Sequence, residues 1–409
     1  MTANDIRNIC LLGHGGSGKT TLAEQMLFMT KGTDRLGRTA DGNTVCDYDA
    51  EEIKRQITIS TAVAPVNYGG CKINVLDCPG FFDFVGESLA AIRAVEAGII
   101  LCSAKDGLSV GAERAWKYLR NAKVPAAFCI SKCDEEHGDY YKVLDSLKAK
   151  YGSIVCPVTV PMSDGSGVID LVHNIAYQTK GNKTTKVPVP AADAGKVEEL
   201  REALMESAAG ATEELMEKFF DTMELSEADM AEGIKVGLRE RSVVPVFASA
   251  AMSCIGTEAL LQGIVDYVSN PGEMEGIDPA GPTLGFVFKT ISDQYGKYSY
   301  VKVLSGSIKP DMPMVNARTG ETEKLGRLYI PKGKKYTEVK ELTCGDIGAI
   351  AKMDKVKTGD TLCEPRKVVK IEPIPFDEPC YSVAIAPKTR GQEDKMAQGL
   401  NRLNEEDPS

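Results

Sequence analysis

Apolar and polar positions along the first 155 residues alternate in a rhythm that predicts strands and helices in turn. Short apolar runs, typical of buried strands, are separated by stretches in which apolar residues recur every three to four positions, as on one face of a helix. The predicted strands are 6–12, 72–77, 98–103, 126–131 and 153–160. The predicted helices are 18–30, 84–96, 111–122 and 138–150. This order predicts an α/β fold with a mostly parallel sheet, whose strands end at one common ligand-binding edge.

Residues from about 156 to 245 interrupt this rhythm. They are rich in Glu, Ala and Met, and they have helical spacing over 196–224 and 226–240. The strand–helix pattern then returns, with a strand at 243–248 followed by a helix. We therefore expect an inserted subdomain at about 156–245, within a first domain that spans residues 1–275, and not a separate domain.

The pattern changes again from Thr283 onward, where short alternating strands are separated by glycine turns. Examples are 284–288 and 300–306. Regular spacing of such strands is typical of a small all-β barrel, and we expect one as a second domain over 280–372.

A third pattern begins after the prolines that end the barrel region. Residues 377–409 predict a strand at 380–386 and a helix at 393–404. Two elements are too few for a domain. We expect this segment to be the beginning of an α+β third domain that is truncated in this chain.

Composition narrows the class of protein. The 409 residues carry a net charge of −10, which argues against binding to DNA through overall charge but leaves room for a local contact with structured RNA. The 12 cysteines include no C-x-x-C pair and there are only three histidines, so zinc-site spacing is absent. Cysteines such as Cys10, Cys102 and Cys129 lie in apolar runs, as reduced core residues do. Reduced cysteines and the absence of a run of about 18 apolar residues predict a cytoplasmic protein without a membrane partner. We also expect the protein to be a monomer.

Residues 13–20 form a complete G-x-x-x-x-G-K-[ST] phosphate loop between a predicted strand and a predicted helix. Its glycines let backbone N–H groups close on a phosphate chain, and the helix N-terminus adds partial positive charge. We expect Lys19 at the β- and γ-phosphates and the Thr20 hydroxyl on Mg²⁺. The nucleotide-binding residues predicted here are Gly15, Gly16, Ser17, Gly18, Lys19, Thr20 and Thr21.

Two further segments have the spacing of nucleotide switches. Asp77-Cys78-Pro79-Gly80 ends a predicted strand, where Asp77 would hold Mg²⁺ through water and the Gly80 N–H would bond the γ-phosphate. Arg55-Gln56-Ile57-Thr58-Ile59 lies between this motif and the phosphate loop, and Thr58 could reach both Mg²⁺ and the γ-phosphate. The alternative for Thr58 is an ordinary strand residue, because 57–61 is rich in β-branched side chains.

A guanine-specific motif follows the strand at 126–131. Ser131-Lys132-Cys133-Asp134 matches N-K-x-D except that Ser replaces Asn. The Asp134 carboxylate would accept hydrogen bonds from guanine N1–H and the 2-amino group, which adenine lacks, and the Lys132 stem would lie on the base. Ser131 is expected to connect fewer loops than Asn would, which weakens nucleotide affinity. Ser249-Ala250-Ala251 fits a turn whose backbone N–H binds guanine O6, so the ligands expected are GTP or GDP with Mg²⁺.

In order and spacing these elements resemble the translational GTPases, and most of all elongation factor G. The departures described below resemble its divergent elongation factor G-like branch. Residues 77–84 are similar to the family's D-T-P-G-H-x-D-F, and 55–59 to its R-G-I-T-I. The insertion, the barrel and the last thirty residues are similar to the family's extra subdomain, second domain and start of the third. The resemblance implies GTP hydrolysis on the ribosome, with Lys19, Thr58 and Gly80 as catalytic groups.

The chain departs from the family pattern at four positions. Phe81 stands where the family has the catalytic His that orients the attacking water, and Phe offers no hydrogen bond. Gly16 stands for Asp, Gln56 for Gly and Ser131 for Asn. Two functions therefore stay open: a GTPase that hydrolyses GTP when it docks on the ribosome, or a hydrolysis-poor GTP-state protein that binds or protects ribosomes.

Overall fold

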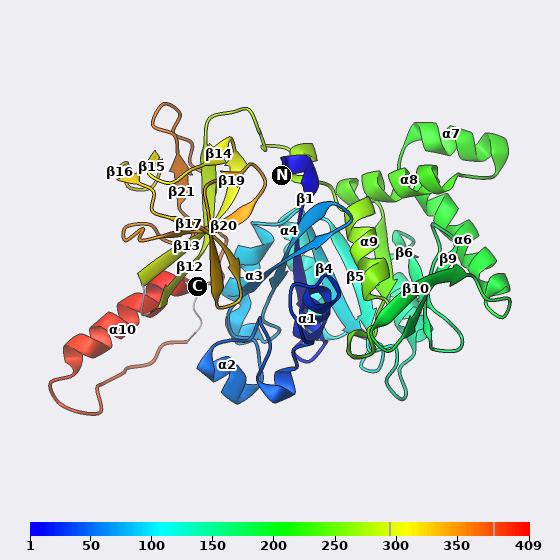
Figure 1. Ribbon diagram of the computed structural model, residues 1–409, viewed down its shortest axis with the longest axis horizontal. Helices are drawn as coiled ribbons and strands as arrows, with labels where there is room; N and C mark the ends of the chain where they lie inside the picture. Colours follow the sequence, from blue (N-terminus) through cyan, green and yellow to red (C-terminus); the bar gives the residue numbers. More distant parts are fainter. Residues whose placement is uncertain (294–295, 379–380) are drawn as a thin grey trace. The chain divides into compact units, whose positions relative to one another are not determined.

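The computed structural model describes residues 1–293, 296–378 and 381–409 (Figure 1). The chain folds as two compact units. The first comprises Arg7–Asp83 and Val95–Ser269, and the second comprises Met1–Ile6, Phe84–Ala94 and Asn270–Ser409.

The first unit is built on a seven-stranded sheet in the order β2-β3-β1-β4-β5-β11-β6. Strands β1 and β4 are buried along their whole length, which explains why they read as continuous apolar runs. Pairing is parallel from β1 through β4, β5 and β11 to β6, while β2 and β3 form an antiparallel hairpin. The predicted α/β fold is confirmed. The strands are β1 (Ile6–Gly13), β2 (Ala62–Tyr68), β3 (Cys71–Asp77), β4 (Ala97–Ser103), β5 (Ala126–Ser131), β6 (Val155–Pro157) and β11 (Val244–Ala248).

Helices α1, α4, α5 and α9 pack against this sheet. The side chains of Ser109 and Asp139 cap α4 and α5, each accepting a hydrogen bond from a backbone N–H of the first turn. Trp116 of α4 stacks on Phe128 of β5 with ring centroids 5.6 Å apart, and Tyr151 of α5 joins the same cluster. The helices are α1 (Lys19–Met29), α2 (Ala50–Arg55), α4 (Val110–Asn121), α5 (Tyr140–Tyr151) and α9 (Thr257–Tyr267).

The segment from 159 to 240 contains a separate antiparallel sheet as well as helices. Its order is β10-β9-β8-β7, with β7 (Thr159–Pro161), β8 (Gly167–Asp170), β9 (Ile175–Lys180) and β10 (Lys183–Pro188). The helices are α6 (Ala194–Ala209), α7 (Glu213–Thr222) and α8 (Glu227–Glu240). Figure 1 shows this sheet and α6–α8 together, in green.

Two predictions for this segment are wrong in detail. The strand predicted at 153–160 divides into β6 and β7, which belong to different sheets. The helix predicted at 196–224 breaks into α6 and α7, because α6 ends at Gly210 and the Thr212 side chain caps a new helix by accepting from Leu215 N. The sheet β7–β10 was not predicted. Ser226 and Asp229 form a capping box at the start of α8.

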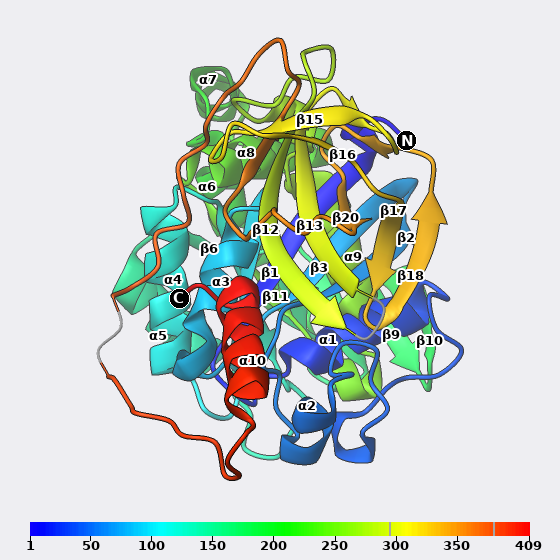
Figure 2. The ribbon, with the colours of Figure 1, turned by 90° about the vertical axis from the view of Figure 1, so that its left-hand side faces the viewer.

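The second unit holds a β-rich domain, as predicted (Figure 2). Eight strands follow the order β16-β15-β21-β12-β13-β20-β17-β18, and β14 pairs with β19. Inward-facing residues such as Val287, Val301 and Ile350 are completely buried in one core. The strands are β12 (Leu284–Asp293), β13 (Gly296–Ser305), β14 (Ser307–Ile308), β15 (Pro313–Asn316), β16 (Thr322–Lys324), β17 (Leu328–Lys332), β18 (Lys335–Val339), β19 (Leu342–Thr343), β20 (Ile347–Ala351) and β21 (Thr361–Cys363).

Helix α3 (Val85–Ile92) belongs to this second unit, where Glu87 forms a buried ion pair with Lys289 of β12. At the other end of the chain, the predicted last helix is present as α10 (Glu393–Glu406), and Glu405 accepts a 3.0 Å hydrogen bond from the Lys297 ammonium. Figure 2 shows α10 beside the ends of β12 and β13.

The strand predicted at 380–386 is wrong for residues 381–386, and Cys380 lies outside the described residues. Apolar side chains alternate there at Tyr381, Val383 and Ile385, but all three are exposed and no described strand pairs with them. Among the described residues, no helix is both long and apolar enough to cross a bilayer. Cys10, Cys102 and Cys129 are buried free cysteines, as predicted.

Candidate nucleotide-binding site

The phosphate loop connects the end of β1 to the start of α1. Gly16 and Gly18 adopt left-handed backbone conformations with φ of 77° and 95°, which glycine adopts without strain. Gly18 directly precedes the first turn of α1, so the free N–H groups of that turn face the loop. The loop therefore has the geometry of an anion cradle.

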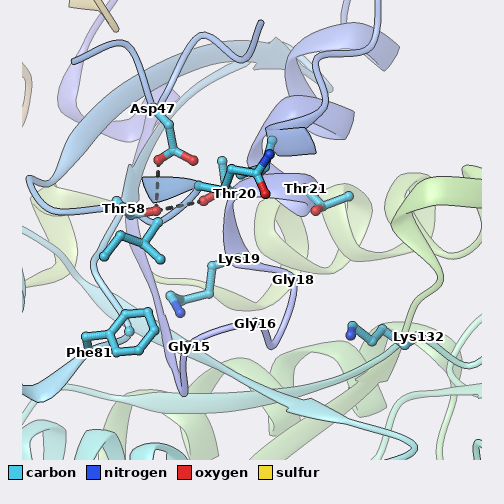
Figure 3. Close-up of a pocket in the computed structure, with 14 residues that line it drawn as sticks. Gly15, Gly16, Gly18, Lys19, Thr20, Thr21, Asp47, Thr58, Phe81 and Lys132 are labelled. Atoms are coloured by element: carbon cyan, nitrogen blue, oxygen red, sulfur yellow. Dashed lines mark hydrogen bonds between the residues drawn. The ribbon is translucent and has the colours of Figure 1, made fainter. Parts of the chain in front are cut away.

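Lys19 is almost completely buried at the centre of this cradle (Figure 3). Its ammonium donates hydrogen bonds to the carbonyl oxygens of Gly13, at 3.1 Å, and His14, at 2.9 Å. Burial lowers the pKa of Lys19, and the nearby Asp77 and Asp47 carboxylates act in the opposite direction. The loop carbonyls thus fix the position of the Lys19 ammonium, which we expect to bind phosphate.

A chain of hydroxyl groups joins α1 to the segment before β2. Thr58 donates to Asp47 Oδ1 at 2.8 Å, and its oxygen lies 3.0 Å from the Thr20 hydroxyl (Figure 3). Because the Thr58 proton is directed at Asp47, the Thr20 hydroxyl is the donor in the second bond. The alternative of a strand residue at Thr58 is wrong, since β2 begins at Ala62.

Asp77 ends β3 and is completely buried. Neither carboxylate oxygen accepts a hydrogen bond from a described residue. Burial raises the pKa of Asp77 and the nearby Asp47 carboxylate raises it further, while Thr20 and Lys19 act in the opposite direction. Unpaired buried carboxylate oxygens next to Lys19 fit a divalent cation, because a bound cation would compensate their charge.

The described residues contain no group of three or more His, Cys, Asp or Glu side chains that could hold a metal. The side chains that could bind a metal ion here are instead the Thr20 and Thr58 hydroxyls and the Asp77 carboxylate. Mg²⁺ prefers oxygen ligands and commonly takes several of them from water and phosphate. These residues therefore fit Mg²⁺ in the company of a nucleotide.

The segment after Asp77 closes on the phosphate loop. A Cβ atom on Gly80 would lie 2.6 Å from Gly15 N and 2.5 Å from the Lys19 ammonium, so no larger residue fits. Phe81 follows, 44% exposed, with its ring against Gly15. Its neighbour Phe82 lies under the Arg114 guanidinium, 4.2 Å from ring centroid to Cζ.

A cavity of 300 Å³ opens between these segments. Its walls include six of the predicted phosphate-loop residues and Gly80, together with Thr58, Phe81 and Lys132. The lining residues are Gly15, Gly16, Gly18, Lys19, Thr20, Thr21, Thr39, Asp47, Gln56, Ile57, Thr58, Gly80, Phe81 and Lys132. Ser17, Asp77, Ser131, Asp134 and Ser249–Ala251 do not line it.

The predicted guanine motifs meet at the ends of β5 and β11. Ser131 Oγ donates to the Ser17 carbonyl at 2.7 Å, which ties this motif to the phosphate loop. Cys133 N donates to the Ser249 carbonyl at 3.2 Å. The Asp134 carboxylate accepts from the Ser253 hydroxyl, shortly after Ala250 and Ala251.

Comparisons with known families agree with this geometry. The "Elongation factor Tu GTP binding domain" model matches residues 4–270, "Elongation factor G domain 2" matches 282–365 and "Elongation Factor G, domain III" matches 376–409. The chain belongs to the elongation factor G-like translational GTPases. The crystal structure of ttk003000868 from Thermus thermophilus is similar, with a TM-score of 0.90 and 31% identity over 99% of this chain. The chain spans 61% of the length of that protein.

Three residues of this elongation factor G-like site were missed by sequence reasoning. Asp47 binds Thr58, Ser253 binds Asp134, and Thr39 lines the cavity. None of them belongs to a motif. The only sequence signal for Asp47 is that it is a carboxylate between the phosphate loop and residues 55–59, both of which are expected to bind the same Mg²⁺.

Proposed function

We propose that this elongation factor G-like protein binds GTP with Mg²⁺ and hydrolyses it to GDP and phosphate while docked on the ribosome. The observation that best supports this proposal is at Asp77, the last residue of the strand beside the phosphate loop. Both of its carboxylate oxygens are buried, and unpaired among the described residues. We propose ribosomal RNA and proteins as partners, a monomeric state and the cytoplasm as compartment. The domain limits proposed are 1–275, 280–372 and 377–409.

The roles proposed for individual residues follow the predicted motifs. The backbone of Gly15 to Thr21 and the Lys19 ammonium would hold the phosphates, with the Gly80 N–H at the γ-phosphate. Thr20, Thr58 and Asp77 would hold Mg²⁺, which when bound neutralises charge on the phosphates. The guanine contacts would come from Ser131, Lys132, Asp134, Ser249, Ala250 and Ala251.

A specific observation favours a second candidate, a GTP-state ribosome binder or ribosomal-protection protein with little hydrolysis. The Phe81 side chain, which lines the cavity, has no polar atom. An orienting group for the attacking water would then have to come from outside this side chain. Loss of such a group lowers the rate of phosphoryl transfer by orders of magnitude.

Single-turnover GTP hydrolysis, measured with and without purified ribosomes, tests the proposal. We expect slow hydrolysis by the protein alone and faster hydrolysis with ribosomes. Tight GTP binding without acceleration by ribosomes would support the second candidate. Equal affinity for ATP and GTP would overturn both, because both depend on guanine recognition.

A further inference from the structure

Buried carboxylates hold the segment that carries Thr58. The first is Glu24 on α1, which is 1% exposed. Its Oε1 atom accepts hydrogen bonds from the backbone N–H groups of Val45, at 2.7 Å, and Cys46, at 3.0 Å. One oxygen on the phosphate-loop helix thus fixes the beginning of the segment 45–60.

Glu52 on α2 fixes the end of the same segment. Its Oε1 atom accepts from Ile59 N at 3.0 Å and from Ser60 N at 3.1 Å. Its Oε2 atom accepts from Asp49 N at 3.1 Å, which closes the capping box of α2. Both oxygens are therefore used as acceptors, and the side chain is 2% exposed.

Between these anchors, the Thr58 side chain is directed at the phosphate loop. The Thr58 hydroxyl donates a hydrogen bond to Asp47, and the Thr58 oxygen lies 3.0 Å from the Thr20 hydroxyl. Ile59, whose N–H is held by Glu52, directly follows Thr58. The position of the Thr58 hydroxyl is thus set by bonds made within the protein.

We propose that Glu24 and Glu52 are positioning residues that hold Thr58 beside Thr20, and that they thereby favour GTP over GDP. The inference rests on the proposed function, because it takes Thr58 to contact Mg²⁺ and the γ-phosphate. Ordering a mobile segment around the γ-phosphate lowers GTP affinity, and the hydrogen bonds to Glu24 and Glu52 reduce that cost. GDP lacks the γ-phosphate, so its affinity does not depend on whether this segment is ordered.

The use of buried carboxylates argues for this role over general stabilisation of α2. Burying an ionised carboxylate is unfavourable unless hydrogen bonds replace its water. The neighbouring Glu51 is half exposed and already supports α2 through an ion pair with Arg55. In all the hydrogen bonds described above, Glu24 and Glu52 accept from backbone N–H groups between 45 and 60. These bonds therefore fix the backbone conformation of this segment.

The substitution Glu52→Gln tests the proposal in the intact protein. Gln has the same shape but only one acceptor oxygen, so it cannot accept from Asp49 N and from Ile59 N together. We expect the Kd of a non-hydrolysable GTP analogue to rise about tenfold. The Kd of GDP should stay within about twofold of wild type. Glu51→Gln removes the same charge from the adjacent position and should change neither constant.

An equal loss of affinity for both nucleotides would overturn the proposal, since it would indicate damage to the fold or to the whole site. Unchanged affinities for Glu52→Gln would overturn it as well.

Hydrogen exchange of the protein with a bound non-hydrolysable GTP analogue gives a second measurement. We expect the amides of Val45, Cys46, Ile59 and Ser60 to be protected in the wild type, and Ile59 and Ser60 to exchange faster in Glu52→Gln. Exchange of all four at the rate of an exposed loop would overturn the proposal. Failure of the wild type to bind any guanine nucleotide would instead count against the proposed function.

Discussion

The ring of Phe81 lies against Gly15 of the phosphate loop, where a Cβ atom on Gly15 would be 2.9 Å from Cε2 of the ring. That separation is too short for any side chain at position 15, so the ring of Phe81 can occupy this place only because residue 15 is glycine. Both residues line the cavity in which we place the phosphates. This pairing makes position 81 the first place to test catalysis.

Phe81→His should accelerate ribosome-stimulated GTP hydrolysis by at least about tenfold, because an imidazole can orient the attacking water and a phenyl ring cannot. Histidine is smaller than phenylalanine, so it fits beside Gly15. Single-turnover rates with saturating ribosomes are the measurement. Phe81→Leu is the matched control, and it should not accelerate the reaction. A similar rise in both variants would mean that the ring itself obstructs the site.

Ser131→Ala should weaken the binding of GTP and GDP alike by about tenfold, because it leaves the buried Ser17 carbonyl without its donor, at a cost of about 1–3 kcal/mol. That bond joins Ser131 Oγ to the Ser17 carbonyl in the phosphate loop. Fluorescence titration with labelled GDP and GTP measures the effect. Ser146→Ala, which removes an exposed hydroxyl on α5, is the control and should bind as wild type does. Unaltered binding by Ser131→Ala would show that this tie does not shape the site.

Asp134→Asn should lower GTP affinity by about a hundredfold or more and admit xanthosine triphosphate, since the amide can donate to the xanthine oxygen that replaces the 2-amino group. Competition between the two nucleotides for the purified variant measures the change in base preference. Glu136→Gln, a nearby exposed position, should behave as wild type. An unchanged base preference would contradict the assignment of Asp134 to guanine.

Stability should depend on pH through His173. The Asp170 carboxylate, 2.8 Å from Nδ1, raises the pKa of His173. A raised histidine pKa stabilises the fold fully below the unfolded value of about 6.5, and this contribution is lost as pH rises through the folded value. The difference in urea midpoint between pH 6 and pH 8.5 should be smaller in His173→Asn than in the wild type. Identical differences in the two proteins would contradict this.

Sequence was a good guide to the sheet because its strands are buried on both faces. Strands such as β1 and β4 appear as unbroken apolar runs, and the phosphate loop fits between one of them and a helix. Motif spacing also placed Lys19, Thr58 and Gly80 at one cavity. Their nucleotide roles stay predictions.

Features that depend on distant partners were not predictable in the same way. The short strands β7–β10 mix polar and apolar residues, so they carry no clear period. Tyr381, Val383 and Ile385 do have the period of a strand, but they lack a neighbour among the described strands. Glu24 acts on N–H groups 21 and 22 positions away, and no local pattern marks such a contact.

The two carbonyl bonds of Lys19 have a consequence for nucleotide binding. The Gly13 and His14 oxygens accept two of the three protons of the ammonium. The third proton would be available to a phosphate oxygen, so a phosphate chain at this site would share the charge of Lys19 with the loop. The carbonyls also replace water that Lys19 loses on burial, and they would therefore help to set the affinity that the site can reach.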